Sequence, residues 1–586
     1  MCGIFGYAGT KRAAPLVYAG LKKLEYRGYD SAGIATVTAE GISLYKRRGR
    51  VEEIRPAREM KGTVGVGHTR WATHGEPSEA NAHPHVFGNF AVVHNGIIEN
   101  FQSLKGECER RGEAFASETD SEVIAHLLAY YYRGDVLAAL KATAARLKGA
   151  FALAVLCKEE PDCIYCARRF SPLLFARFKE GYALASDFLA LAQGGGEAFA
   201  LGDGEFARLA KEGVSFYSAE LKPIEKEPLE YDVSWRSPEK RGYAHFMKKE
   251  MKEIPESVEK SCFSLDKTQF SELFEVLCHT KHLHFVACGT AFHAAYAAKY
   301  AAEAIARIPT EVCLASEYRY KDPVIQEGTL VVAVSQSGET ADTLAAAEIA
   351  KTRGAPLLAV TNVPYSSLAR LADFCLTTGA GREIAVAATK SYNAQLAALY
   401  SLVLAFANRD AEGEIGSFPA LLKSALRRSE RVRRWSNYFI GAKCVLFIGR
   451  GQDYVSALEG SLKFKEITYL PSEGYAAGEL KHGTLALVDG NTPVVAILSD
   501  ERLAEKTMNA VHEAASRGAK VFLITTIKKY ARKKEAFASL LLPPCKAEFS
   551  PLVTSVPLQA LAYYVALALG NDPDKPRNLA KSVTVE

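Results

Sequence analysis

The sequence contains no run of about 18 to 20 apolar residues, the length that a helix needs to cross a membrane. Its longest apolar stretches, AALYSLVLAFA from Ala397 and LQALAYYVALAL from Leu558, are shorter than that. The N-terminus also lacks a basic start followed by an apolar core and a cleavage site, so no export signal is predicted. We therefore expect no membrane partner and a cytoplasmic location.

Neither sign of charge is in large excess, because 72 lysines and arginines face 67 acidic residues and leave a formal net charge of +5. So small a net charge does not indicate nucleic acid as a partner. The basic runs at 427–434 and 528–534 are interpreted as solvated faces on and beside helices.

The 12 cysteines show no repeated spacing, which in a chain of this length favours reduced thiols over disulfides. Cys163 and Cys166 form a CxxC pair, but side chains three residues apart on a strand point to opposite faces of the sheet. We interpret both as core thiols. His83 and His85 raise the alternative of a metal site, yet no cysteine or paired carboxylate lies near them at a familiar zinc spacing. No metal is predicted.

A length of 586 residues with 48% hydrophobic content allows about three or four domains, each with its own core. Short strand-like runs mixed with helical stretches predict an α+β domain over residues 1–220. Four prolines and dense charge without apolar periodicity predict a linker over 221–255. Two α/β domains are predicted over 256–425 and 426–586.

These last two segments share one plan of strand, glycine turn, helix, strand, loop and helix, which indicates a duplicated α/β unit. Buried strands alternating with helices predict parallel sheets whose ligand sites lie at the carboxyl ends of the strands. Only the first copy carries the polar loop SQSGET at 335–340, whereas the second has LSDERL at 498–503. We expect one copy to bind a ligand that the other does not.

Cys2 directly follows the initiator Met1. Removal of Met1 would leave a cysteine with both a thiol and a free α-amine, which is a nucleophile with its own base. The alternative is a small second residue without a function. The motifs that follow resemble, in order and spacing, those of glutamine amidotransferases of the N-terminal-nucleophile class: LEYRGYDSAG (24–33), GHTRWATHG (67–75), HNGIIENF (94–101) and SETDSEV (117–123).

This resemblance implies αββα layers and a glutamine pocket. Two fixed donors would stabilise the oxyanion of the reacting amide, and opposite charges would hold the two charged ends of glutamine. The implied residues are Asn95 and the Gly96 N–H for the oxyanion, Arg70 and Asp120 for the α-carboxylate and α-ammonium, Thr73 and His74 for the pocket lining, and Trp71 as the gate of an ammonia channel.

The SQSGET loop follows an apolar strand and opens a helix near Glu339, so its N–H groups and hydroxyls suit a phosphate. The alternative is an ordinary serine and threonine turn with a helix cap. A second loop, ACGT at 287–290, favours the phosphate, and the two loops together resemble the sugar isomerase (SIS) fold of doubly wound α/β units. That resemblance implies the sugar-phosphate ligands Ser335, Gln336, Ser337 and Thr340, with Thr290 as a further candidate.

In the second copy, Glu459, Lys463 and Glu466 lie at i, i+4 and i+7, on one helical face. Such pairs are usually solvated surface. The sequence EGYAAGELKHG, ending at Gly483, and the chain end RNLAKSVTVE nevertheless make the whole chain resemble the glutamine:fructose-6-phosphate aminotransferase family.

The family resemblance implies glutamine and fructose 6-phosphate as substrates, no metal or organic cofactor, and a homodimer in which His482 acts across the interface. The implied roles are a Schiff base on Lys581, proton transfer between C1 and C2 by Glu466, ring opening by His482, support of proton transfer by Lys463, and positioning of the closing groups by Glu459.

Two positions depart from the family pattern, since Ala291 and Ala388 stand where serine is usual or frequent. Each change removes a hydroxyl that would be worth about 1 kcal/mol if it bound the sugar phosphate. A related amidotransferase acting on another sugar phosphate therefore remains an alternative. A non-catalytic sugar-phosphate sensor is a second one, although Glu466, His482 and Lys581 argue against it.

Overall fold

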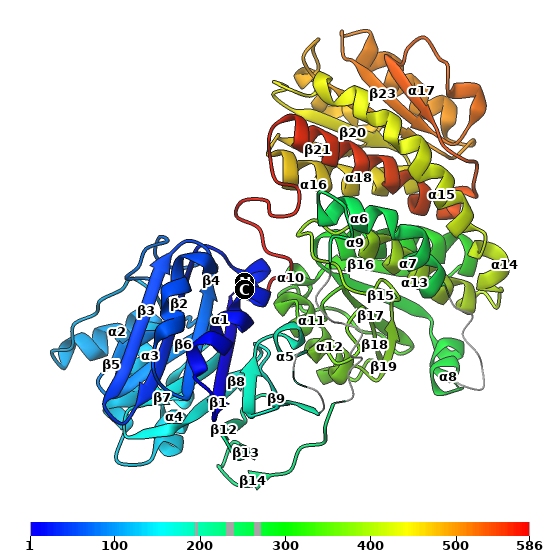
Figure 1. Cartoon of the computed structure of the whole chain (residues 1–586). Helices are drawn as coiled ribbons and strands as arrows, with labels where there is room; N and C mark the ends of the chain where they lie inside the picture. The colour runs from blue at the N-terminus through cyan, green and yellow to red at the C-terminus, as the bar shows by residue number, and fades with distance from the viewer. Residues whose placement is uncertain (1, 193, 195–196, 230–238, 263–270, 585–586) are drawn as a thin grey trace. The chain divides into compact units, whose positions relative to one another are not determined.

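The computed structural model describes residues 2–192, 194, 197–229, 239–262 and 271–584 (Figure 1). The chain divides into two compact units, which are described separately. The N-terminal unit comprises Met1–Pro238 with Ala580–Glu586, and the C-terminal unit comprises Glu239–Leu579. The division after residue 238 lies within the range expected as a linker.

The N-terminal unit contains two seven-stranded antiparallel sheets. The first runs in the order β11 (Ala198–Ala200), β9 (Leu174–Phe178), β10 (Gly181–Ala185), β1 (Gly3–Gly9), β4 (Val64–Arg70), β2 (Ser31–Thr38) and β3 (Gly41–Arg48). The second runs in the order β14 (Pro223–Ile224), β13 (Gly213–Tyr217), β12 (Phe206–Ala210), β8 (Glu160–Arg169), β7 (Phe151–Cys157), β6 (Phe90–Gly96) and β5 (His85–Phe87).

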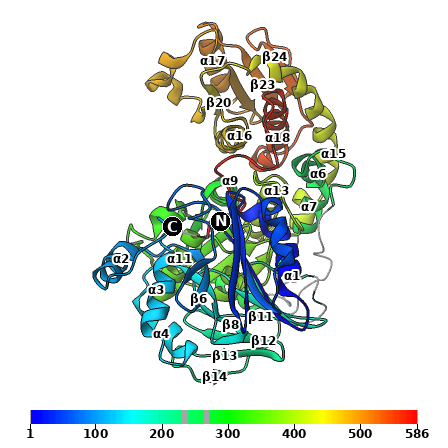
Figure 2. The same cartoon turned by 60° about the vertical axis from the view of Figure 1, so that its left-hand side comes forward.

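Helices cover the outer faces of these sheets: α1 (Ala13–Leu24), η1 (Glu25–Arg27), η2 (Val51–Glu59), α2 (Phe101–Arg110), α3 (Glu122–Tyr131), α4 (Val136–Arg146) and α5 (Phe188–Leu191). Figure 2 shows α1 on one side of the strands and α3 with α4 on the other. Between the sheets, Val66, Val93 and Leu156 belong to one buried cluster. The αββα layering confirms the expected fold class.

The cysteines of β8 follow its alternation. Cys163 packs in the cluster beneath α3 and α4, whereas Cys166 packs between the two sheets. Both are free and buried, and burial raises the pKa of each thiol. The two side chains therefore lie on opposite faces, as the spacing predicts.

The C-terminal unit contains two five-stranded parallel sheets with the same strand order. The first has β16 (Thr310–Leu314), β15 (His282–Ala287), β17 (Thr329–Ser335), β18 (Leu357–Thr361) and β19 (Phe374–Thr377). The second has β21 (Ser472–Ala476), β20 (Val445–Gly449), β22 (Val494–Leu498), β23 (Val521–Thr525) and β24 (Ala538–Leu541). The repeated order confirms the duplicated doubly wound unit.

The first copy has the helices α8 (Ser271–His279), α9 (Gly289–Ala301), η4 (Ala302–Ala306), α10 (Ala315–Tyr318), α11 (Ala341–Thr352), α12 (Ser367–Leu371), α13 (Lys390–Phe406), α14 (Ala411–Ile415) and α15 (Phe418–Ser429), preceded by α6 (Phe246–Lys252) and α7 (Ile254–Ser261). The second copy has η5 (Glu430–Tyr438), α16 (Gln452–Thr468), η6 (Glu479–His482), η7 (Thr484–Leu487), α17 (Ala504–Ala515), η8 (Lys528–Tyr530), η9 (Ala547–Phe549) and α18 (Pro551–Ala568).

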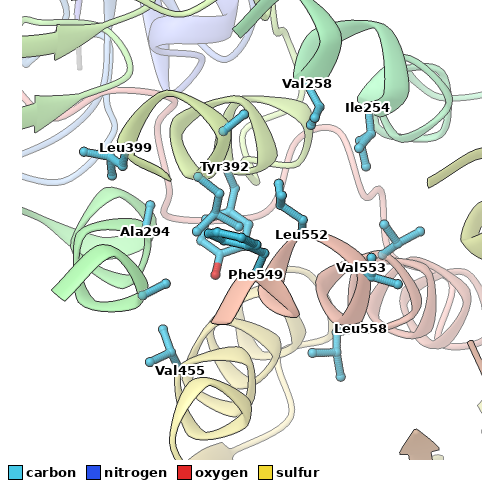
Figure 3. Close-up of a cluster of buried hydrophobic side chains, with 14 of the residues drawn as sticks. Ile254, Val258, Ala294, Tyr392, Leu399, Val455, Phe549, Leu552, Val553 and Leu558 are labelled. Atoms are coloured by element: carbon cyan, nitrogen blue, oxygen red, sulfur yellow. The ribbon is translucent and has the colours of Figure 1, made fainter. Parts of the chain in front are cut away.

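One hydrophobic core joins the two copies. Figure 3 shows Ala294 of α9, Tyr392 of α13, Val455 of α16 and Leu552 of α18 converging on it. Each large aliphatic side chain buried there contributes about 1.5 to 3 kcal/mol relative to exposure. The two copies therefore pack against each other within one compact unit.

Helix α18 is longer than the apolar run from Leu558 suggested, because it already begins at Pro551. By length and composition it could cross a membrane, but 83% of it is buried inside the structure. Mostly buried core helices pass the same test, and its residues Val553, Leu558 and Leu561 belong to the shared core.

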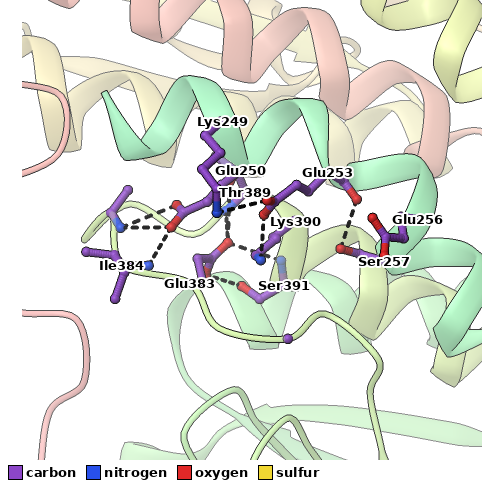
Figure 4. Close-up of polar contacts among 12 residues, drawn as sticks. Lys249, Glu250, Glu253, Glu256, Ser257, Glu383, Ile384, Thr389, Lys390 and Ser391 are labelled. Carbon is purple, nitrogen blue, oxygen red and sulfur yellow. Dashed lines mark hydrogen bonds and ion pairs between the residues drawn. The ribbon is translucent and has the colours of Figure 1, made fainter. Parts of the chain in front are cut away.

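The range expected as a linker contains buried helix at its end. Helix α6 places Glu250 against the loop that precedes α13, where its carboxylate accepts the Ile384 N–H at 2.5 Å (Figure 4). In that loop Glu383 is 4% exposed and accepts the N–H and hydroxyl of Ser391 at 3.1 and 2.6 Å. Buried polar groups of this kind hold a loop in one conformation when all partners are satisfied.

Candidate functional site

Cys2 lies at the start of β1, against the end of β4. Its Sγ accepts the Trp71 N–H at 3.4 Å, and its carbonyl oxygen accepts the side-chain amide of Asn95 at 3.1 Å. Burial raises the pKa of the Cys2 thiol, although the Trp71 N–H and the charge of Arg70 oppose that shift. A thiol that is mostly protonated at rest needs a base before it becomes a nucleophile.

Asn95 and Gly96 end strand β6. Gly96 has φ of +137°, and a Cβ there would lie 1.9 Å from the carbonyl oxygen of Ala150. Only glycine fits this backbone and this approach. The structure therefore brings the predicted nucleophile Cys2 together with the predicted oxyanion donor Asn95.

Arg70 and Asp120 are each 3% exposed, and both act electrostatically on the Cys2 thiol. The Arg70 guanidinium donates to the carbonyl of Gly75 at 3.0 Å and also to that of His74. Burial lowers the pKa of Arg70. One carboxylate oxygen of Asp120 accepts the Ile98 N–H at 2.8 Å, and the other accepts the Ser121 hydroxyl at 3.3 Å.

The remaining predicted pocket residues lie on the loop after β4. Thr73 Oγ1 is 3.4 Å from His74 Nδ1, and the His74 ring packs edge-on against Phe101 with centroids 5.2 Å apart. Asp30 also shapes this loop, because it accepts the Ala72 N–H at 2.8 Å. Asp30 was not singled out from the sequence, although it stands in the YRGYDSAG motif.

The SQSGET loop follows β17 at the carboxyl edge of its sheet. Ser335 Oγ lies 2.9 Å from Thr340 Oγ1 and accepts the Gly338 N–H at 3.1 Å, while Ser337 Oγ accepts the Glu339 N–H at 3.2 Å. Helix α11 begins at Ala341, not near Glu339, because Gly338 has φ of +64° and turns the chain first. Hydroxyls and N–H groups converge in a tight turn, as a phosphate site requires.

The ACGT loop follows β15, the parallel neighbour of β17, so both loops lie at the switch point where ligands bind in such sheets. Thr290 lies in the first turn of α9. Its hydroxyl donates to Glu459 of α16 at 3.1 Å, and His293, one turn later on α9, lies 2.7 Å from the other Glu459 oxygen. This contact joins the two copies.

Lys463 is 1% exposed and forms ion pairs with both neighbouring carboxylates, at 2.6 Å to Glu466 and 3.7 Å to Glu459. Burial opposes the charged form of Lys463, but Glu466 and Glu459 outweigh it and raise the pKa of the ammonium. The three charges are therefore not a solvated face. His293 was missed from the sequence, and its only signal was the spacing of one helical turn from Thr290.

The second copy holds its own anion where the first has the SQSGET loop. Ser499 directly follows β22 and donates two hydrogen bonds to the carboxylate of Asp453. Its N–H donates at 2.7 Å, its hydroxyl donates to the other oxygen, and both bonds are buried. Asp453 is 3% exposed. An internal carboxylate thus takes the donors that a phosphate would need, which explains why the duplicated sheets differ in their expected ligand.

Asp453→Asn is expected to stabilise the C-terminal unit in a pH-dependent way. Burial raises the pKa of Asp453 to about 6. The folded state therefore prefers the protonated acid, so stability is complete below the ordinary pKa of about 4 and is lost as pH rises through about 6. At pH 8 the ionised Asp453 carboxylate lowers the free energy of unfolding by about 3 kcal/mol. The asparagine variant lacks this charge, so its melting temperature should be higher by about 4 °C. Calorimetry at pH 4 and pH 8 checks this, and an equal shift at both pH values would contradict it.

His482 and Lys581 lie on segments other than α16, the helix that carries Glu459, Lys463 and Glu466. His482 is exposed on η6, whereas Lys581 is half-buried in the C-terminal segment that groups with the N-terminal unit. Ala291 lies buried in the first turn of α9, and Ala388 is half-buried in the loop before α13. Neither alanine supplies a side-chain donor to the switch point.

A glutamine amidotransferase domain model matches residues 68–193, and a SIS domain model matches residues 276–405 and 438–569. The chain is 45% identical over 612 residues to the glutamine–fructose-6-phosphate aminotransferase (isomerizing) of Clostridium tetani, and the match covers 100% of both chains. A protein of the same name from Aquifex aeolicus is 42% identical over 597 residues, again covering 100% of both. The solved C-terminal domain of glucosamine-fructose-6-phosphate aminotransferase from Francisella tularensis covers 58% of this chain and 100% of its own, with 40% identity and a TM-score of 0.55.

Proposed function

The chain belongs to the family of isomerizing glutamine–fructose-6-phosphate aminotransferases, and from this premise we propose which residues carry each half of the reaction. The overall reaction converts glutamine and fructose 6-phosphate to glutamate and glucosamine 6-phosphate. Glutamine hydrolysis belongs to the N-terminal unit, whereas the phosphate loop and the charged array that we assign to the sugar reaction lie in the C-terminal unit.

In the first half, Cys2 Sγ attacks the side-chain amide carbon of glutamine while the thiol proton passes to the α-amine of the processed chain. The amide oxygen becomes an oxyanion, and Asn95 Nδ2 with the Gly96 N–H stabilises it. Ammonia leaves with that proton, and water then hydrolyses the thioester to glutamate. Arg70 and Asp120 hold the charged ends of glutamine, while Thr73 and His74 line the pocket.

In the second half, the phosphate of fructose 6-phosphate binds at the switch point through Ser335, Gln336, Ser337 and Thr340. His482 opens the sugar ring, and Lys581 forms an imine at C2 with loss of water. Ammonia then replaces the lysine. Glu466 moves the proton between C1 and C2.

The burial of the Glu459–Lys463–Glu466 array carries this proposal. Glu459 and Lys463 are each 1% exposed, and a buried charged array is costly unless its members are paired. A sensor would need only the phosphate loop, whereas a charged array that contacts the first copy through Thr290 suits proton transfer. Lys463 forms an ion pair with the proposed base Glu466 at 2.6 Å, and Glu459 hydrogen-bonds to Thr290 and His293 and so ties α9 to α16.

We further propose that Trp71 gates a channel for ammonia, because ammonia released into water would be protonated and lost as a nucleophile. The enzyme acts in the cytoplasm as a homodimer in which each His482 serves the partner's sugar site. The exposure of His482 on η6 supports this, since a ring at the surface is free to reach a second copy. The chemistry needs no metal or organic cofactor.

One assay tests the proposed function. The full chain is incubated with glutamine and fructose 6-phosphate, and glucosamine 6-phosphate and glutamate are measured together. We expect both in a ratio near one. Glutamate without the amino sugar would overturn the assignment of the acceptor, and a parallel series of other ketose phosphates would then identify the substrate that accommodates Ala291.

The double variant Ser335→Ala, Ser337→Ala is expected to raise the apparent KM for the sugar phosphate tenfold or more, because two hydroxyls leave the phosphate turn. A tenfold change corresponds to about 1.4 kcal/mol. The KM for glutamine, measured as hydrolysis without sugar, should stay the same. Ser499→Ala, at the matching place of the second copy, is the control and should leave both KM values unchanged. An unchanged sugar KM in the double variant would move the phosphate to the ACGT loop.

A further inference from the structure

Four buried histidines form a layer behind the predicted oxyanion donor. His68 of β4, His83, His85 of β5 and His94 of β6 are each at most 3% exposed. The rings of His68 and His83 stack with centroids 4.1 Å apart, and those of His83 and His85 lie 4.5 Å apart. Burial lowers the pKa of His68 and of His85 to about 3. Each neutral ring therefore has one N–H and one lone pair.

The contacts of His68 decide which of its nitrogens carries the hydrogen. His68 Nε2 lies 2.9 Å from the carbonyl oxygen of His94 and 3.1 Å from Oδ1 of Asn95. A backbone carbonyl can only accept a hydrogen bond. His68 Nε2 must therefore be the N–H donor, and it donates to both oxygens.

This donor also decides the orientation of the Asn95 amide. An N–H facing Asn95 needs the oxygen of the amide, so the NH₂ group must point the other way, where it donates to the carbonyl of Cys2 at 3.1 Å. A flipped amide would place the Asn95 NH₂ against the His68 N–H. It would also turn the Asn95 Oδ1, which can only accept a hydrogen bond, toward the place where the oxyanion develops. Two donors face to face cannot hydrogen-bond.

We propose that His68 is a positioning residue that locks the Asn95 side chain with its NH₂ group toward the oxyanion. This inference rests on the proposed function of Cys2 and Asn95 and adds a residue that does not itself touch glutamine. A donor aimed in advance at the developing charge needs no reorganisation during the reaction, which is what makes such donors effective.

The neighbouring histidines help to hold His68 and the His94 carbonyl in position. His83 Nδ1 accepts the His94 N–H at 3.2 Å and its ring stacks on His68. His94 Nδ1 in turn lies 2.8 Å from the hydroxyl of Ser121. The backbone carbonyl that fixes the His68 tautomer is thus held in place by a second ring of the same layer.

His68→Leu removes the donor and leaves the Asn95 amide free to rotate. We expect kcat for glutamine hydrolysis to fall about 100-fold, in the range seen when an oxyanion donor is removed, with KM for glutamine within about twofold. His68→Gln restores an N–H at the end of its side chain, so it should recover kcat to within about fivefold of the wild type. His85→Met, an equally buried histidine of the layer that contacts Thr119 and not Asn95, is the matched control and should keep kcat.

A second measurement separates positioning from a loss of folding. Glutamate γ-semialdehyde adds to Cys2: a bond forms between Sγ and the aldehyde carbon, the C=O π bond breaks, the thiol proton passes to the α-amine, and the oxygen becomes the anion that the oxyanion donors bind. Its affinity should fall about 100-fold in His68→Leu, whereas the affinity for glutamate should not change. Equal losses for both ligands would overturn the inference, as would wild-type kcat in His68→Leu. Hydrolysis that survives in Cys2→Ala would instead overturn the proposed function, so the two failures are distinguishable.

Discussion

Cys2→Ala is expected to lower the rate of glutamine hydrolysis at least about 1,000-fold while leaving isomerisation of fructose 6-phosphate intact. The thiol is the attacking group of the proposed thioester, and alanine offers no nucleophile. The Glu459–Lys463–Glu466 array that we propose for the sugar chemistry lies in the other compact unit. Glutamate release and sugar isomerisation are measured on the same preparation.

The matched control is Cys444→Ala, a half-buried free thiol of the C-terminal unit, which should retain both activities. Blocking removal of Met1 should impair hydrolysis as strongly as Cys2→Ala, because an acylated α-nitrogen cannot accept the thiol proton. Mass spectrometry of the intact chain establishes whether Met1 is present. Glutaminase activity in Cys2→Ala would rule out Cys2 as the nucleophile.

Much of the fold could be predicted because its signals are local. Short strand-like runs mixed with helical stretches predicted the α+β domain, and alternation of apolar strands with helices predicted two parallel sheets. The shared core could not be predicted in this way. Tyr392 of α13 and Leu552 of α18 belong to one core although they lie far apart in sequence, and no periodicity indicates which buried faces meet.

The same distinction applies to the candidate site. Motif spacing identified Cys2 and Asn95, which the structure places in contact. It did not identify His293 or Asp453, whose partners Glu459 and Ser499 lie 166 and 46 residues away. His68 lies in the motif GHTRWATHG, but the sequence did not indicate its role. That role depends on which atoms contact its ring in the fold and not on the residues next to it in sequence.

The polar loop of the first copy was predicted as the ligand site because the second copy lacks it, and Asp453 gives this asymmetry a physical cause. A phosphate approaching the second copy would meet a buried carboxylate already bound to the Ser499 N–H. In the second copy, a carboxylate of the chain itself therefore occupies the place that corresponds to the polar loop of the first copy. In the first copy the hydroxyls of Ser335 and Thr340, which we propose as phosphate ligands, bond to each other and to their own turn.

Lys581→Arg is expected to abolish formation of glucosamine 6-phosphate while glutamine hydrolysis stays measurable. A neutral lysine amine adds to the C2 ketone and loses water to give an imine, which acidifies the C1 proton once it is protonated and lets ammonia replace the lysine. Arginine remains charged and cannot add to the ketone. Lys575→Arg, shortly before it in the chain but in the C-terminal unit, is the control and should keep full activity.

Trapping the imine identifies the lysine directly. Borohydride with fructose 6-phosphate should reduce the imine to a stable secondary amine, so that the wild type gains the mass of one sugar phosphate on Lys581 while Lys581→Arg gains none. The same experiment on Ser335→Ala, Ser337→Ala should give less adduct at low sugar concentration, because the sugar must bind before it reacts. Reduction on another lysine, or product formation by Lys581→Arg, would remove the Schiff-base role from Lys581. If no lysine were reduced, His482 and Glu466 would have to isomerise the ketose without a covalent anchor, and ammonia would have to attack the ketone itself.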